Sequence, residues 1–159
     1  MPVSRGKRLG LFGILFAALA ISTSCASEGP WKQFMEAAGN AGAQGNYVDE
    51  EKQLQLALSE AMKFGPADAR VATTLDRLSL VCNRKGKYEE GVGFGERSVA
   101  ISEKVRGPNS VDTGISLGNL AENYVMLKRF DQAEALHKRS LAIIEKALGP
   151  DNLTLAASL

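Results

Sequence analysis

The residues that could carry out acid–base, nucleophilic or metal chemistry are few in this chain. His137 is the only histidine, and Cys25 and Cys82 are the only cysteines. A serine nucleophile needs a histidine base held by an acid, and a zinc site needs several ligands at close spacing, so one isolated histidine supports neither. The carboxylate pairs Glu50-Glu51 and Glu89-Glu90 stand at expected helix starts, where negative charge interacts favourably with the helix dipole. These residues predict a protein that is not an enzyme and that uses no cofactor or metal ion.

Cys25 is the residue whose position predicts a covalent modification. Arg5, Lys7 and Arg8 precede an apolar run that extends from Leu9 to Ile21. That run is shorter than the roughly 20 residues needed to span a bilayer as a helix. A basic start, a short apolar core and small residues at 22–24 are typical of a secretory signal peptide. A cysteine directly after them resembles the lipid acceptor of bacterial lipoproteins, with cleavage before Cys25.

Two alternatives to lipidation stay open at the N-terminus. Ordinary cleavage after Ala26 would give a soluble periplasmic or secreted protein, and an uncleaved segment would act as an anchor. Lipidation would place the protein on the periplasmic side of a bacterial membrane or at the cell surface, and Ala26 after the cysteine favours the outer membrane. Without residues 1–24, 16 basic and 18 acidic residues remain, a net charge of −2. This balance indicates membrane attachment through the lipid rather than through charge, and it argues against a nucleic-acid partner.

The rest of the chain is organised as a repeat with a constant period. Gly-Pro recurs with a constant interval at positions 65–66, 107–108 and 149–150, and the interval from Tyr88 to Phe130 equals the interval between these pairs. Glycine favours the left-handed cap at the end of a helix, and proline cannot continue one, so each Gly-Pro pair separates two helices. A fixed period of this length predicts an array of identical supersecondary units.

Each unit is predicted to be a pair of antiparallel helices. The short link at Lys128-Arg129 separates two segments in which apolar and small residues recur at helical spacing. In the third unit these residues are Leu117, Leu120, Ala121, Tyr124 and Leu127 in the first segment, and Ala133, Leu136, Ser140, Ile143 and Ile144 in the second. Cys82 stands at the inward position that Tyr124 holds in the third unit. We therefore expect the Cys82 side chain to be a small buried apolar group.

Glycines interrupt the second helix expected in the second unit. Gly91 matches Ala133 of the third unit, so helix packing explains it, whereas nothing in the sequence explains Gly93 and Gly95. The run from 91 to 95 lies inside a helical pattern with no strand before it, which argues against a phosphate-binding loop.

Two short segments resemble the helix-to-helix turn of tetratricopeptide repeats: Gly86-Lys87-Tyr88-Glu89-Glu90 and Lys128-Arg129-Phe130-Asp131-Gln132-Ala133-Glu134. Residues 71–75 and 139–151 resemble the longer repeat type of kinesin light chains. The resemblance extends from Trp31 to the C-terminus and implies an all-α fold, a short right-handed solenoid of about three helical hairpins. Glu50 stands at the small-residue position held by Gly91 and Ala133, so the first unit is degenerate.

The predicted organisation has six parts. They are a signal peptide at 1–24, a linker at 25–30, a degenerate first repeat at 31–66, a second repeat at 67–108, a third repeat at 109–150, and the start of an incomplete fourth repeat at 151–159. Because that fourth unit is incomplete, we expect apolar residues of the preceding helix, Ile144 and Leu148 among them, to be left exposed.

The resemblance implies that the first helix of each unit lines a concave face that binds a protein or peptide. The candidate binding residues are Thr73, Asp76, Leu80, Asn83, Arg84, Ile115, Asn119, Glu122, Val125 and Met126. Kinesin-type repeats carry asparagines that clamp a peptide backbone. Asn119 retains one of these, whereas Asp76, Arg77 and Gly118 stand at the others.

The predicted function is that of an exported, lipid-anchored scaffold or adaptor for protein–protein interaction. The alternative is a structural N-terminal piece of a larger array that self-associates through its open C-terminal end.

Overall fold

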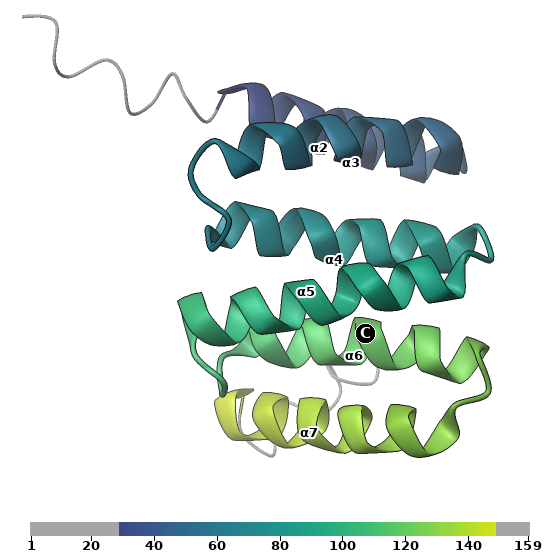
Figure 1. Ribbon diagram of the computed structural model, residues 1–159, viewed down its shortest axis with the longest axis vertical. Helices are drawn as coiled ribbons and strands as arrows, with labels where there is room; N and C mark the ends of the chain where they lie inside the picture. Colours follow the sequence, from purple (N-terminus) through teal and green to yellow (C-terminus); the bar gives the residue numbers. More distant parts are fainter. Residues whose placement is uncertain (1–28, 149–159) are drawn as a thin grey trace, which may run out of the picture.

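The computed structural model describes residues 29–148, so the predicted signal peptide, Cys25 and residues 151–159 lie outside the described residues. Within this range the chain forms six α-helices (Figure 1). They are α2 (Gly29–Ala43), α3 (Tyr47–Met62), α4 (Ala69–Arg84), α5 (Tyr88–Arg106), α6 (Val111–Met126) and α7 (Phe130–Leu148). No helix of this part of the chain combines the length and apolar character needed to cross a membrane.

The helices form three antiparallel hairpins, α2–α3, α4–α5 and α6–α7, stacked along the long axis of the molecule (Figure 1). Helix α3 packs on α4, and α5 packs on α6, so each hairpin contacts the next. This arrangement confirms the all-α fold of about three repeats.

The turn inside each hairpin needs one residue in the left-handed region. Gly45 and Gly86 supply it with φ of +71° and +74°, and Lys128 adopts φ of +59° in the third hairpin. Glycine carries no steric cost there, whereas a residue with a Cβ does. In the first hairpin, Asn46 caps α3, and residues 47–49 already form the first turn of that helix.

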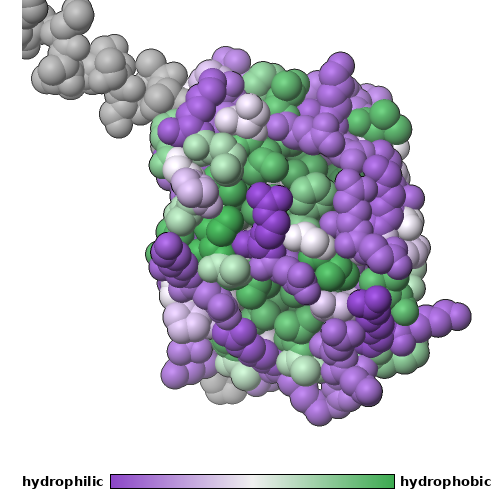
Figure 2. Space-filling view, viewed as in Figure 1, coloured by the Kyte–Doolittle hydropathy of each residue, from purple (hydrophilic) through white to green (hydrophobic). Residues whose placement is uncertain are grey.

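The core consists of leucine, valine and alanine side chains between neighbouring hairpins. One cluster joins α2, α3 and α4 and contains Ala38, Leu54, Ala61, Val71, Leu75, Leu78 and Val81. A second joins α5, α6 and α7 and contains Val92, Leu120, Ala121, Tyr124 and Ala133. Of the predicted inward positions of the third unit, Leu127 and Leu136 are half-buried and the others are buried. On the outer surface, apolar and polar side chains are interspersed (Figure 2).

A serine hydrogen bond repeats from hairpin to hairpin. The Ser98 hydroxyl donates to the Ala72 carbonyl at 2.9 Å, and the Ser140 hydroxyl donates to the Gly114 carbonyl at 2.6 Å. Both members of the second pair lie one repeat period after those of the first. The small side chain and its bond to the facing backbone hold the two helices of a hairpin close together.

The expectation that Ile144 is left exposed is wrong. Its side chain is only 7% exposed, since it packs with Ile143 over Gly114 of α6. Leu141, on the other side of α7, is 44% exposed. The side chain of Leu148 lies outside the described residues.

Candidate functional site

One face of the stack, formed by the first helices α2, α4 and α6, carries three hollows. The N-terminal hollow lies between α2 and α4, the central hollow between α4 and α6, and the terminal hollow between α6 and α7. Arg77 and Leu80 line both of the first two, and Ile115 and Asn119 line both of the last two. Because neighbouring hollows share lining residues, they form one continuous row, which we call the first-helix groove.

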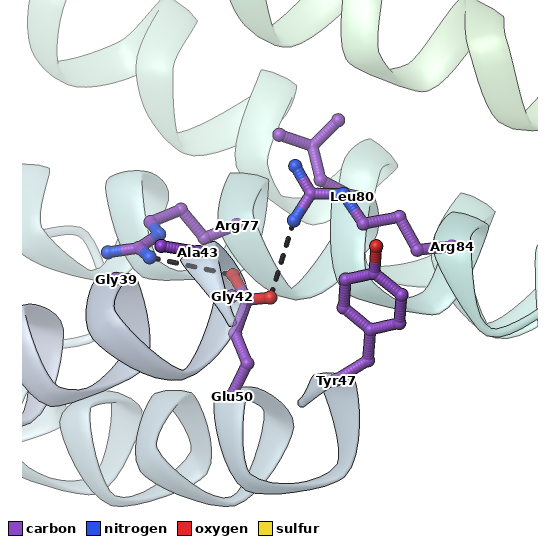
Figure 3. A pocket seen from close by; sticks show the side chains of 8 residues that line it. All are labelled: Gly39, Gly42, Ala43, Tyr47, Glu50, Arg77, Leu80 and Arg84. Atoms are coloured by element: carbon purple, nitrogen blue, oxygen red, sulfur yellow. Dashed lines mark hydrogen bonds and ion pairs between the residues drawn. The ribbon is translucent and has the colours of Figure 1, made fainter. Parts of the chain in front are cut away.

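The N-terminal hollow, about 400 Å³ in volume, is built around a buried carboxylate (Figure 3). Glu50 of α3 is only 3% exposed and lies 3.5 Å from the Arg77 guanidinium and 3.3 Å from that of Arg84. Arg77 also donates to the Met35 carbonyl at 2.9 Å, and the Arg84 guanidinium lies 5.6 Å from the centre of the Tyr47 ring. Two cations facing one carboxylate leave this hollow with a net positive charge.

Gly42 explains how a glutamate fits where the other units have a small residue. A Cβ added at Gly42 would lie 2.6–2.8 Å from the carboxylate group of Glu50. The missing side chain on α2 therefore makes room for the larger one on α3. The sequence indicated that Glu50 interacts with the helix dipole at the start of α3. In the fold, its carboxylate is also the ion-pair partner of two arginines of α4.

The central hollow, about 250 Å³ in volume, contains a carboxylate with one unpaired oxygen. Oδ2 of Asp76 accepts a hydrogen bond from Ser116 at 2.7 Å, while Oδ1 is buried and has no hydrogen-bond partner among residues 29–148. Burial raises the pKa of Asp76 above its ordinary value, and hydrogen bonds from Ser116 and Ser98 oppose that shift. Arg106 also lines the hollow and forms a 2.5 Å ion pair with Asp112. Asp76 therefore retains the capacity to accept one more hydrogen bond.

The terminal hollow is the largest of the three, at about 520 Å³, and its walls differ in character. Ile115, Leu141 and Ile144 provide apolar surface, and Gly118 and Ser140 also line the hollow. At the rim, His137 lies 3.7 Å from Glu122, and both side chains are largely exposed.

Most of the residues predicted from the sequence line the groove. Leu80 and Arg84 line the N-terminal hollow, Thr73, Asp76, Leu80, Ile115 and Asn119 line the central one, and Ile115, Asn119 and Glu122 line the terminal one. Three others lie outside these hollows: Asn83 faces Asn123, Val125 packs against the second core cluster, and Met126 is exposed.

Several lining residues were not predicted from the sequence, chiefly Tyr47, Glu50 and Arg106. They come from the second helices, so the rule that first helices line the face could not include them. Arg77 could have been found, because it shares a helical face with Leu80 and Arg84 at spacings of three and four residues.

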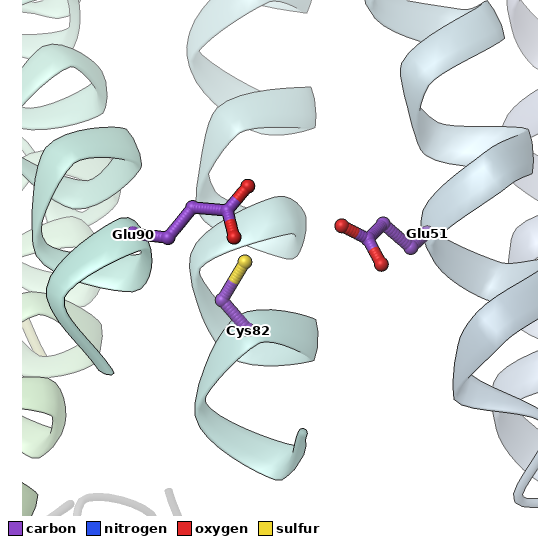
Figure 4. Close-up of side chains that lie close together, drawn as sticks. All are labelled: Glu51, Cys82 and Glu90. Carbon is purple, nitrogen blue, oxygen red and sulfur yellow. The ribbon is translucent and has the colours of Figure 1, made fainter. Parts of the chain in front are cut away.

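The fold also brings together three groups that the sequence keeps apart, Glu51 of α3, Cys82 of α4 and Glu90 of α5. One ligand atom from each lies within 4.8 Å of the others, with the two carboxylates on opposite sides of the thiol (Figure 4). Lys85 pairs with Glu51, and Lys87 lies 3.3 Å from Glu51 and 3.2 Å from Glu90.

The ion pairs of Lys85 and Lys87 with Glu51 and Glu90 argue against a metal site in this cluster. Two ammonium groups already balance the two carboxylates, and burial raises the pKa of Cys82 to about 11, so the thiol is protonated at neutral pH. The cluster therefore serves as an ion-pair network that joins α3, α4 and α5.

Comparison with known proteins agrees with this architecture. The family model described as tetratricopeptide repeat matches residues 70–146. Among solved structures, the crystal structure of the TPR domain of Arabidopsis FLU superposes with a TM-score of 0.67 at 16% sequence identity, covering 76% of this chain and 98% of that one. At this identity the likeness shows a shared fold. Comparison with curated protein sequences gives no match.

Proposed function

We propose that this chain is an exported, lipid-anchored adaptor, because residues 70–146 match the tetratricopeptide repeat model and this fold generally serves as a scaffold for protein–protein interaction. Its first-helix groove binds an extended segment of a partner protein. The observation that carries this proposal is the continuity of the three hollows across α2, α4 and α6.

The lining of the groove indicates what kind of segment it takes. The positive N-terminal hollow, with Arg77 and Arg84, favours an acidic side chain or a terminal carboxylate. The unpaired oxygen of Asp76 accepts a backbone or side-chain N–H group of the ligand, and the apolar walls of the terminal hollow take an aliphatic side chain. We therefore propose a ligand in which an acidic group precedes or follows an apolar one along an extended backbone.

A photocrosslinking experiment tests the groove. A photoreactive amino acid at Leu80, which lines two hollows, is expected to crosslink one partner protein in intact cells. The matched control is Leu56 of α3, an exposed leucine outside the hollows. Arg84→Glu, which reverses a charge in the N-terminal hollow, is expected to reduce the Leu80 adduct. Equal adducts from positions 80 and 56, or an adduct that survives Arg84→Glu unchanged, would argue against recognition in the groove.

Export and lipidation are supported by the sequence of residues 1–25 alone. Labelling cells with an alkyne fatty acid is expected to mark the wild-type chain and leave Cys25→Ala unlabelled and in the soluble fraction. A wild-type chain that is processed but takes up no label would replace the lipoprotein interpretation with plain secretion, and the groove proposal would stand.

A further inference from the structure

The two arginines of the N-terminal hollow keep N–H donors that the described part of the chain does not use. Nη1 of Arg84 donates to Glu50 at 3.3 Å, whereas Nη2 and Nε form no hydrogen bond with residues 29–148. Arg77 donates from Nη1 to the Met35 carbonyl at 2.9 Å, and its Nη2 lies 3.5 Å from Glu50. The Arg84 side chain is 46% exposed and lines the hollow, so its remaining donors are open to an anion.

Glu50 sets the charge that such an anion meets. Of the described residues that line the hollow, only Glu50, Arg77 and Arg84 carry a formal charge, and together they give +1. The Glu50 carboxylate lies between the two guanidinium groups (Figure 3) and is 3% exposed, so salt and water screen it poorly. An anion that contacts both arginines therefore also approaches a buried negative charge.

This charge count distinguishes two kinds of acidic group. A carboxylate carries one negative charge and balances the hollow, whereas a phosphoryl group carries roughly −1.5 to −2 at neutral pH. The phosphoryl group would leave an excess of negative charge next to Glu50. Like charges repel more strongly in a partly buried site than in bulk water, so the phosphoryl group is disfavoured.

The arrangement belongs to this hollow and not to the repeat in general. Asn119 and Met126, which are uncharged, stand one repeat period after the two arginines. Gly91 occupies the position of Glu50 in the second unit. Of the three hollows described, only the N-terminal one combines a buried glutamate with two arginines that face it.

We propose that Glu50 restricts the N-terminal hollow to a singly charged carboxylate of the partner segment and excludes a phosphorylated side chain. Because this selectivity concerns the ligand of the first-helix groove, it rests on the proposed function. It is nevertheless measured with small anions, which require no identified partner.

Acetate and methyl phosphate are the probes, each titrated at pH 7.5 and constant ionic strength into the full chain carrying Cys25→Ser. The Arg84 Nε–H resonance in a ¹⁵N NMR spectrum reports occupancy of the hollow. Acetate is expected to shift this resonance saturably, with an affinity several-fold higher than that of methyl phosphate. Methyl phosphate that binds as tightly as acetate would overturn the proposal, and so would a resonance that neither anion shifts.

A charge-removing variant assigns the selectivity to Glu50. Glu50→Gln keeps a side-chain oxygen for Arg84, and it is expected to raise the affinity for methyl phosphate several-fold more than that for acetate. The control Glu60→Gln removes the same charge from α3 outside the hollow and should leave the ratio of the two affinities unchanged. A wild-type ratio in Glu50→Gln would refute the role of Glu50. The wild-type titrations stand even if Glu50→Gln does not fold.

The crosslink at Leu80 separates this selectivity from the groove function. An adduct that depends on Arg84, together with equal affinities for the two anions, would refute the selectivity and leave the groove proposal in place. Selective anion binding without that adduct would refute the groove function and, with it, the assignment of the carboxylate to a partner segment.

Discussion

Three glycines of α5 look alike in the sequence and differ in what surrounds them. A Cβ at Gly91 would lie 2.3 Å from the Asn123 side-chain oxygen, and one at Gly95 would lie 3.0 Å from Leu120. A Cβ at Gly93 would meet nothing within 4 Å. Gly91 and Gly95 therefore permit α6 to approach α5, while Gly93 only lowers the helix propensity.

This difference predicts opposite effects for the same substitution. Gly93→Ala is expected to stabilise the protein by about 0.5–1 kcal/mol, because alanine loses less backbone entropy in a helix. Gly91→Ala is expected to destabilise it by about 1–3 kcal/mol, since Asn123 is buried and donates to Ser79 at 2.9 Å and cannot easily move. Urea unfolding of both variants measures the two effects. A Gly91→Ala variant as stable as the wild type would mean that Asn123 is not held in place.

Cys82 is fully buried, with a pKa raised to about 11 mainly by that burial. In a chain carrying Cys25→Ser, its thiol is expected to react with a disulfide reagent at pH 8 at least about two orders of magnitude more slowly than the thiol of the unfolded chain, because little thiolate is present. The reaction is followed in buffer and in denaturant. Equally fast labelling in the two conditions would show that α4 exposes the thiol.

At the scale of the element, the start of α4 combines a cap with an ion pair. The Asp68 carboxylate accepts from the Arg70 backbone N–H at 2.9 Å and from its guanidinium at 2.8 Å and 3.1 Å. The Arg70 hydrogen bond is the main reason that the pKa of Asp68 is lowered. A lowered pKa contributes stability above the unfolded value of about 3.9, and that contribution is lost as the pH falls through the folded value.

Two variants separate the cap from the charge. Asp68→Ala removes both and is expected to cost about 1 kcal/mol at pH 7, whereas Asp68→Asn keeps a capping oxygen and should cost less. The deficit of the alanine variant should shrink as the pH falls below 4, where wild-type Asp68 becomes protonated. Thermal melts at pH 7 and pH 3 test both statements. A deficit that is equal at the two pH values would rule out a contribution from the carboxylate charge.

At the scale of the whole molecule, the buried carboxylate of Asp76, at the centre of the proposed binding groove, destabilises the folded protein when it is ionised. Its pKa is raised, so the ionised group lowers stability relative to the unfolded chain once the pH exceeds the unfolded value of about 3.9. Sites that bind ligands often retain such unfavourable groups. The unpaired oxygen is therefore interpreted as a contact reserved for the partner.

Asp76→Asn is expected to raise the melting temperature at pH 7, because it removes a buried charge and keeps an acceptor for Ser116. The advantage should disappear near pH 3, where wild-type Asp76 is protonated. The same variant should give less of the partner adduct at position 80. A variant that melts below the wild type at pH 7 would show that the ionised carboxylate is stabilising.

The sequence by itself determined the helices, their pairing and the constant period set by the Gly-Pro pairs. These features depend on local signals, namely Gly-Pro pairs that end helices and apolar residues at spacings of three and four. It also identified the small residues between paired helices, such as Ala133 and Ser140, because they recur in register from one unit to the next.

Only the tertiary structure decided which polar side chains meet. The contacts of Glu50 with Arg84, of Asp76 with Ser116 and of Asn123 with Ser79 join residues 34, 40 and 44 positions apart. Such contacts depend on how far each hairpin is rotated and shifted on the one before it, which follows from the shapes of all the packed side chains rather than from any local motif. For that reason, the resemblance to tetratricopeptide repeats implied a groove, while its charge and the unpaired oxygen of Asp76 became apparent only from the packed hairpins.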